Sequence, residues 1–264
     1  MPRSTLSVAI ITLNEAANLA RTLVSVRFAD EIVVVDSGST DSTVEIARSF
    51  GAKVFSEEWK GFALQKNSAI DKCAGTWVLS LDADEELTAD LQKEIGSMLE
   101  TDEQITPAVD GYRLRLRHIF LGRWMRYGGY YPDMKLRLFR RLTSSGVAHF
   151  TDRPVHESVQ VAGRVETMKE DFLHHGYPDL EVYLEHMNRY STLGARIVAA
   201  KGKTSRLWPV FCWNVALVPL LTFVWNYVFR LGFLDGREGL LLHLYHSAYI
   251  SWKYAKAWRI GARS

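Results

Sequence analysis

Short apolar runs alternate with stretches of helical length through the first hundred residues of the chain. The runs are rich in β-branched side chains and cover residues 7–13, 31–35, 52–55 and 77–81. The stretches between them, at about 16–26, 41–50 and 62–73, are long enough for helices. Short strands separated by helices of roughly 10–15 residues are typical of βαβ units. The pattern therefore predicts an α/β fold with a parallel sheet that is buried on both faces.

Polar side chains follow three of these runs at the point where each predicted strand ends. They are Asn14 with Glu15, the stretch 36–41, and Asp82 with Asp84. Ligands of parallel sheets bind outside the carboxyl ends of the strands. The sequence therefore predicts a binding site at this edge of the sheet.

The triplet Asp82-Ala83-Asp84 ends the last of the four runs. Side chains two positions apart on a strand project to the same side, so the two carboxylates can converge on one point. A hard divalent cation would relieve their repulsion, and such ions commonly accompany phosphate-bearing substrates. The alternative is a solvated acidic loop, because Glu85 and Glu86 follow at once.

The stretch after the second run combines a strand-end acid with a turn. Gly38 permits a tight turn, and the polar residues 39–41 can cap the next helix. Capping alone does not explain Asp36, which lies where a base or a ribose would bind. The first run is followed by Asn14 and Glu15 and not by a glycine-rich phosphate loop, which disfavours a dinucleotide oxidoreductase.

The middle of the chain, from about 110 to 170, changes character. Residues 112–117 and 134–139 alternate between basic and apolar side chains and predict strands with one basic face. The loop 122–133 between them is aromatic and contains glycines, which suits sugar stacking or a lid. The basic face suits an acidic ligand. The alternative for the basic side chains is a solvated face, and the alternative for the loop is a well-packed surface loop.

The last third of the chain is predicted to be helical from about residue 180. Residues 207–229 are almost continuously apolar between Arg206 and Arg230, and roughly 20 apolar residues can span a bilayer. Pro219 and the tryptophans at 208, 213 and 225 fit an interfacial or re-entrant helical pair equally well. A buried core helix is the soluble alternative. We favour membrane contact and leave open whether the segment spans the membrane or lies in it.

Composition sets few further limits. The 264 residues are 47% hydrophobic and 23% charged, as in a globular protein, and the net charge of +2 indicates no strong overall attraction to nucleic acid. Cys73 and Cys212 have no paired spacing, which favours a reducing compartment without disulfides or zinc. The chain starts with a strand-like run and no cleavable signal, so we expect the amino-terminal domain to be cytoplasmic.

Segments 11–15, 33–41, 61–67 and 81–85 resemble the signature of family 2 inverting glycosyltransferases, which have the GT-A fold. Segments 131–133, 137–140, 154–157 and 232–239 are similar to the bacterial lipopolysaccharide core β-1,4-glucosyltransferase subgroup. The resemblance implies a Rossmann-like nucleotide-diphospho-sugar transferase fold with a mostly parallel sheet flanked by helices. It implies a transferase domain over 1–175, with a nucleotide-sugar half (1–100) and an acceptor half (101–175). Residues 176–264 would form an apolar, helical, membrane-associating extension.

The same resemblance assigns roles to individual residues. The residues implied to bind the nucleotide-sugar are Thr12, Asn14, Glu15, Asp36, Ser37, Lys66 and Asp82. Within that set, Asp36 would bind uracil, Lys66 would approach the base or diphosphate, and Asp82 would face the ribose. Asp84 would hold Mn²⁺ or Mg²⁺ on the diphosphate, where the ion stabilises the leaving UDP.

An inverting displacement also needs a general base for the acceptor hydroxyl. The candidates are Glu157, which we favour, and Asp133. His156 beside Glu157 could join the metal shell, although a structural role is the more common one for such a histidine. Arg137 and Arg140 could neutralise phosphate on donor or acceptor. The histidines at 174, 175, 243 and 246 are interpreted as packing or capping residues.

These observations predict a metal-dependent inverting glycosyltransferase that moves a hexose from a UDP-sugar to a lipopolysaccharide-core or related membrane glycolipid. Glucose is the hexose that we favour. Its predicted partners are the UDP-sugar, the glycolipid and the membrane surface, with no nucleic acid. The predicted location is the cytoplasmic face of the inner membrane, as a peripheral or monotopic protein. The alternatives are a polyprenyl-phosphate sugar transferase and a non-catalytic, membrane-bound sugar-nucleotide binder.

Overall fold

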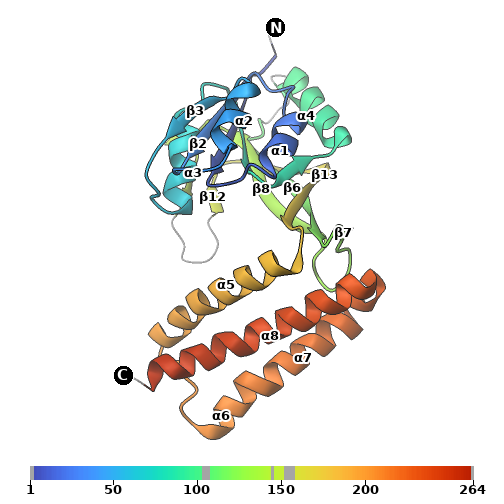
Figure 1. Ribbon diagram of the computed structural model, residues 1–264. Helices are drawn as coiled ribbons and strands as arrows, with labels where there is room; N and C mark the ends of the chain where they lie inside the picture. Colours follow the sequence, from blue (N-terminus) through green and yellow to red (C-terminus); the bar gives the residue numbers. More distant parts are fainter. Residues whose placement is uncertain (1–2, 103–107, 144–145, 152–157, 263–264) are drawn as a thin grey trace. The chain divides into compact units, whose positions relative to one another are not determined.

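The computed structural model describes residues 3–102, 108–143, 146–151 and 158–262. The chain forms two compact units (Figure 1). The first contains the chain up to Leu116 together with Asp133–His175, and the second contains Arg117–Pro132 together with the chain from Gly176 onward. The domain division at residue 175 stays a prediction.

A mixed sheet forms the centre of the first unit. Its strands are β1 (Leu6–Thr12), β2 (Glu31–Asp36), β3 (Lys53–Ser56), β4 (Trp77–Asp82), β5 (Glu85–Leu87), β6 (Gly111–Phe120), β8 (Asp133–Arg140) and β13 (Val165–Tyr177). They lie in the order β3-β2-β1-β4-β8-β6-β13-β5. The first four are mutually parallel, as predicted, whereas β8 runs antiparallel to both β4 and β6. No helix joins β6 to β8, so this connection returns the chain in the opposite direction.

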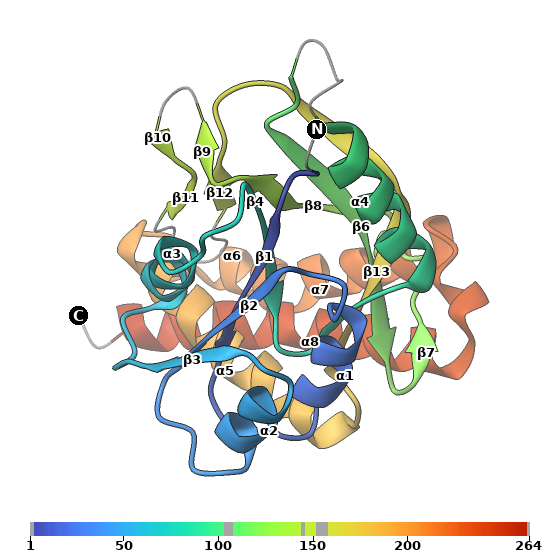
Figure 2. The ribbon, with the colours of Figure 1, turned by 90° about the horizontal axis from the view of Figure 1, so that it is seen from above.

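Helices cover both faces of this sheet (Figure 2). They are α1 (Leu19–Ser25), α2 (Thr43–Ser49), α3 (Phe62–Asp71) and α4 (Ala89–Thr101). Successive strand residues enter different cores: Val8 and Ile10 pack with α1 and α4, whereas Ala9 packs with α3. This alternation explains why the first strand is apolar at consecutive positions. The small strand pair β11 (His149–Thr151) and β12 (Ser158–Gln160) adds Phe150 and Val159 to the α3 side. A further pair is β9 (Leu142–Thr143) and β10 (Gly146–Val147).

The first helix begins later than the sequence predicts. Residue 16 was the expected start, but α1 begins at Leu19. Asn14 has a left-handed backbone (φ 56°), and the Glu15 carbonyl accepts hydrogen bonds from the amides of Asn18 and Leu19. This turn occupies the residues that would have formed the first helical turn.

Three long helical segments dominate the second unit. They are α5 (Leu180–Ala200), α8 (Gly236–Gly261) and the continuous helix Trp208–Phe229. The last consists of α6 (Trp208–Cys212), a π-helical turn (Trp213–Leu217), α7 (Val218–Val224) and a second π-helical turn (Trp225–Phe229). A 3₁₀ turn (Gly232–Asp235) precedes α8, which lies between α5 and α7 (Figure 1).

A loop from the middle of the chain packs onto these helices. Strand β7 (Arg123–Trp124) pairs with the end of β6. Phe120 and Met125 are buried with Tyr183 of α5 and Leu242 of α8. Both carboxylate oxygens of Asp235 accept loop amides, at 3.2 Å from Arg126 and 2.9 Å from Tyr127. The segment 117–132 therefore belongs to the core of the second unit.

Candidate active site

Three parallel strands end side by side at one edge of the sheet in the first unit. Thr12 of β1 lies opposite Asp36 of β2, and Ile11 lies opposite Asp82 of β4. The loops that leave these strands carry most of the residues predicted to bind a nucleotide-sugar. The structure therefore brings Thr12, Asn14, Glu15, Asp36, Ser37, Lys66 and Asp82 to this edge.

Asp36 organises the turn that follows β2. Its carboxylate is buried and accepts hydrogen bonds from the Thr12 hydroxyl, the Ser39 hydroxyl, and the amides of Gly38 and Ser39. Burial opposes its ionisation, but these hydrogen bonds outweigh burial and hold the pKa of Asp36 below its usual value. A carboxylate has about four lone-pair positions, so a base bound here would have to replace one of these donors.

Asn14 joins the loop after β1 to the loop after β2. Its side-chain oxygen accepts a hydrogen bond from the Thr40 backbone amide at 2.8 Å, and its own backbone amide donates to the Ser39 hydroxyl at 2.8 Å. Asparagine is among the few residues that adopt a left-handed backbone at low cost. The buried hydroxyl oxygen of Ser37 in the same turn has no hydrogen-bond partner among the described residues. Buried hydroxyl groups are normally paired, so this oxygen needs a water or a ligand atom to complete its hydrogen bonding.

Asp82 lies between two cations. Its carboxylate is 2.9 Å from the Lys66 ammonium and 2.8 Å from the Arg137 guanidinium. Arg137 also pairs with buried Glu85, whose other carboxylate oxygen accepts the Asp82 amide. Burial opposes ionisation of Asp82, but the charges of Lys66 and Arg137 prevail and lower its pKa. Asp82 is therefore ionised and held by two cations, while burial raises the pKa of the neighbouring Glu85.

Asp84 lies beyond the end of β4 and has a different partner. Its carboxylate is 3.1 Å from Nε2 of His174 on β13. Burial disfavours the charged imidazole, but the carboxylates of Asp84, Glu85 and Asp82 outweigh it and raise the pKa of His174 to about 9. His174 therefore carries a proton at neutral pH. The adjacent His175 lies 2.9 Å from Glu86. The sequence analysis interpreted these histidines as packing or capping residues and missed their pairing with the acidic edge.

Other carboxylates surround the same edge. Burial raises the pKa of Glu15, a hydrogen bond from Asn18 opposes the rise, and the charges of Asp84, Asp41 and Asp82 add to it. Carboxylates close enough to affect one another in this way create a negative potential that favours a cation.

No group of three or more His, Cys, Asp or Glu side chains in the described ranges could hold a metal ion unaided. Asp84 offers one carboxylate, about 20% exposed. Mg²⁺ in phosphate-transfer sites is typically held by one or two carboxylates plus substrate phosphates. The residues present fit an ion that arrives with a diphosphate. They do not fit a resident, fully protein-held ion.

The remaining predicted residues divide into three groups. Glu157 and His156 lie outside the described residues. Asp133 is the first residue of β8. Because β8 is antiparallel to β4, Asp133 lies toward the edge of the sheet where β4 ends. Its carboxylate is 3.0 Å from the Lys135 ammonium. Arg140 is not brought to the site. It lies opposite Trp77 at the start of β4, pairs with Asp102 at 2.6 Å and stacks on the Trp77 ring.

Comparisons with known proteins show the family of this chain. The family model for glycosyl transferase family 2 matches residues 7–159, which is more than half of the chain. The chain belongs to this family. The predicted resemblance to family 2 glycosyltransferases is confirmed, and the protein is an enzyme of the glycosyltransferase class.

Two curated relatives illustrate the similarity. An uncharacterized glycosyltransferase of Rickettsia felis is 34% identical over 214 residues, covering 75% of this chain and 71% of the relative. The lipopolysaccharide core biosynthesis glycosyltransferase LpsC of Rhizobium meliloti is 32% identical over 217 residues, covering 79% of this chain and 77% of LpsC.

One solved structure has the same fold. The mannosyltransferase PcManGT of Pyrobaculum calidifontis, solved with GDP-Man and Mn²⁺, matches with a TM-score of 0.53 and 17% identity. The match covers 97% of this chain and 88% of that chain. The predicted GT-A-type fold, a sheet flanked by helices with a helical C-terminal region, is confirmed. The sheet is mixed, and its parallel half carries the site.

Proposed function

We propose that this family 2 glycosyltransferase moves a hexose from a UDP-sugar to a lipopolysaccharide-core or related membrane glycolipid, with inversion at the anomeric carbon. Glucose is the hexose that we favour. One observation carries the donor half of the proposal: Thr12, Asp36 and Asp82 end adjacent strands, near the buried, unpaired Ser37 hydroxyl and the partly exposed Asp84 carboxylate. Such a concentration of polar groups suits a nucleotide diphosphate. The acceptor half is supported by the similarity to LpsC, which is named for lipopolysaccharide core biosynthesis.

The donor's diphosphate is proposed to bring Mn²⁺ or Mg²⁺ against Asp84. When bound, the ion stabilises the negative charge that develops on the leaving nucleotide. Asp82 has a separate role in this proposal, because Lys66 and Arg137 already neutralise it and hold it in place for a ribose hydroxyl. The presence of Mn²⁺ in PcManGT supports the ion, and its GDP-Man makes a guanosine donor the competing possibility.

Glu157 is the proposed general base, and Asp133 is the reserve. Inversion in one displacement needs no protein nucleophile, only a carboxylate that removes the acceptor proton on the face opposite the leaving group. Asp133 is supported by its place at the start of β8, toward the acidic edge.

The membrane is the proposed location of the acceptor. The helix Trp208–Phe229 is long and apolar enough to cross a bilayer, by length and composition alone, with a mean hydropathy of 1.6. A protein attached by this region to the cytoplasmic face of the inner membrane would meet its donor in the cytoplasm and its acceptor in the bilayer.

Transfer assays with the full-length protein test the donor and the acceptor together. UDP-glucose, UDP-galactose, UDP-GlcNAc and GDP-mannose, each radiolabelled, would be supplied with truncated lipopolysaccharide core or with polyprenyl phosphate, with Mn²⁺ present. We expect label from UDP-glucose in the core lipid, and a β linkage in the product by NMR. Label only in the polyprenyl phosphate would overturn the acceptor, and label only from GDP-mannose would overturn the donor.

A further inference from the structure

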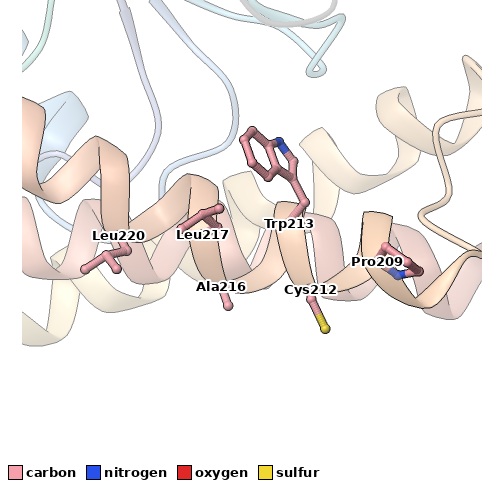
Figure 3. Close-up of a pocket in the computed structure, with 6 residues that line it drawn as sticks. All are labelled: Pro209, Cys212, Trp213, Ala216, Leu217 and Leu220. Atoms are coloured by element: carbon pink, nitrogen blue, oxygen red, sulfur yellow. The ribbon is translucent and has the colours of Figure 1, made fainter.

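The helix Trp208–Phe229 exposes one face that carries only apolar side chains. The stripe follows a helical spacing and includes Trp208, Trp213, Leu217, Leu220, Trp225 and Phe229. The two ends are the most exposed, with Trp208 at 74% and Phe229 at 67%. A shallow open hollow of about 400 Å³ follows the first half of this stripe (Figure 3). We call this stripe the apolar ridge.

The opposite side of the same helix carries its polar contacts. The Ser251 hydroxyl of α8 donates to the Val215 carbonyl at 2.7 Å, and the Ser247 hydroxyl donates to the carbonyl of buried Pro219. The Asn214 amide donates to Ser205 at 2.8 Å. The helix is therefore attached to the protein along its length, and the ridge faces away from that attachment.

The helices behind the ridge are charged. Lys256 of α8 donates to the carbonyl and side-chain oxygens of Asn188, and to Ser191 and Thr192, all on α5. Exposed charges continue along α5 at Glu181, Glu185, Arg189 and Arg196. A helix that crossed the bilayer with α8 and α5 at its side would carry these charges into hydrocarbon, at a large cost. The packing therefore excludes a simple transmembrane orientation.

The charge of this region matches an anionic lipid surface. Residues 201–262 contain eight Lys or Arg and only two Asp or Glu. Exposed arginines flank both ends of the apolar helix, at Arg206 and Arg230. Both ends reach one headgroup layer only if the helix lies parallel to the membrane.

We propose that the apolar ridge lies flat in the headgroup–acyl boundary of one leaflet, with α8 and α5 on the aqueous side. The partner that contacts the ridge is thus a lipid surface containing anionic headgroups. This inference rests on the proposed membrane location and specifies its geometry. The tryptophans at 208, 213 and 225 suit this boundary, because an indole ring is amphipathic.

Depth measurements along the helix test the orientation. Nitroxide labels would be placed on Cys212 and, in the Cys212→Ser background, on Leu220→Cys and Val228→Cys; buried Cys73 should stay unlabelled. The full chain would be bound to phosphatidylethanolamine vesicles containing phosphatidylglycerol. Oxygen and nickel-chelate accessibility should report similar depths for all three labels. A label on Leu193→Cys of α5, an exposed apolar position away from the ridge, should remain in water.

A depth gradient would overturn the proposal. Positions 212 and 228 are about 24 Å apart along a helix, so a spanning helix would place them at clearly different depths. Stable dimers with ridge labels already shielded before lipid is added would assign the ridge to a second copy and also overturn it. Sugar transfer without any vesicle binding would overturn this inference and leave the proposed chemistry intact.

Substitution of the ridge gives an independent readout. Leu217→Glu should weaken vesicle binding about tenfold or more, because a charge would enter the apolar boundary. The matched variant Leu193→Glu should bind like the parent. Near-UV circular dichroism of both variants in detergent would show that they fold, and equal vesicle binding by all three folded proteins would reject the ridge as the contact.

Discussion

At the scale of single residues, the two aspartates of the Asp82-Ala83-Asp84 triplet have different surroundings. Asp82 lies between Lys66 and Arg137 with its side chain 34% exposed, whereas Asp84 is 20% exposed and pairs with His174. Two carboxylates at this spacing in sequence thus do not form one equivalent pair. In the proposed function, Asp84 is the residue that meets the cation, and the following prediction tests that assignment.

We therefore predict that Asp84→Asn abolishes most transfer, by at least about a hundredfold, while the protein still folds and melts cooperatively. Asp84 lies in the turn after β4 and outside both cores, so its substitution removes the charged partner of His174 and no core packing. The matched control is Glu86→Gln, a nearby carboxylate paired with His175, which should retain activity. Transfer would be measured over a range of Mn²⁺ concentrations. Parent activity unchanged by EDTA would contradict the role.

The general base gives a second prediction at this scale. Glu157→Gln should lower kcat by about two orders of magnitude, the usual contribution of such a base, and leave the dissociation constant of UDP-sugar unchanged. Asp133→Asn should change kcat little, because its carboxylate pairs with Lys135. Turnover and calorimetric donor binding would be measured for both variants. The reverse pattern would move the role to Asp133.

The residues that the sequence missed are those whose partners are distant along the chain. Asp36, Asn14 and Lys66 were predicted because each lies in a local motif of the first unit, and their roles stay predictions. His174 reaches Asp84 only because β13 pairs with β5, about 90 residues earlier in the chain. Arg140 belongs to the same basic run as Arg137, but it lies toward the other end of β4 from Asp82. Neither placement follows from spacing.

At the scale of elements, periodicity predicted the helices and strands of the parallel half closely. It could not predict how β8, β6 and β13 complete the sheet, because strand order depends on long-range pairing. The alternation in 112–117 and 134–139 correctly indicated strands, and both lie within longer ones, β6 and β8. The π-helical turns in Trp208–Phe229 have no signal in the hydrophobic pattern.

Glu57 connects the loop after β3 to α3 and should make the free energy of unfolding depend on pH in the acidic range. Hydrogen bonds from Lys72, Ser68 and Lys60 lower its pKa from 4.5 to about 2. Its contribution is complete above pH 4.5 and is lost as the pH falls toward 2. Glu57→Gln should reduce the free energy of unfolding by at most about 1 kcal/mol at pH 7, because solvent screens the group. The difference from the parent should shrink between pH 4.5 and 2, as measured by urea unfolding. A constant difference across that range would contradict the role.

The attachment of the loop Arg123–Tyr131 depends on Asp235. Asp235→Ala removes the acceptor of two loop amides, Arg126 and Tyr127, and hydrogen bonds to a charged group contribute about 1.5–3 kcal/mol each. We expect faster hydrogen exchange at those amides and a lower melting temperature. Glu238→Gln is the control, because its 3.8 Å pair with Arg123 is partly exposed and contributes little. Equal exchange in both variants would show that the loop is held by other contacts.

At the scale of the whole molecule, the two compact units are not consecutive in the chain. The segment 117–132 lies between two parts of the first unit but belongs to the second. The division at residue 175 implied by the family resemblance stays a prediction. Hydrophobic periodicity is a local property, so it gave no indication that 117–132 packs with the later helices. The segment 117–132 belongs to the second unit because Phe120 and Met125 are buried against Tyr183 and Leu242.

A chain truncated after residue 175 should therefore be soluble only if the inserted segment is also removed. In the simple truncation, Phe120 and Met125 lose Tyr183 and Leu242 and become exposed, which favours aggregation. Replacement of residues 117–132 by a short glycine-serine linker removes these side chains and leaves both cores of the first unit complete. We expect this second chain to be monomeric by light scattering and to melt cooperatively. If the simple truncation is equally soluble and cooperative, residues 1–175 form an independent domain and the insertion has no role in its folding.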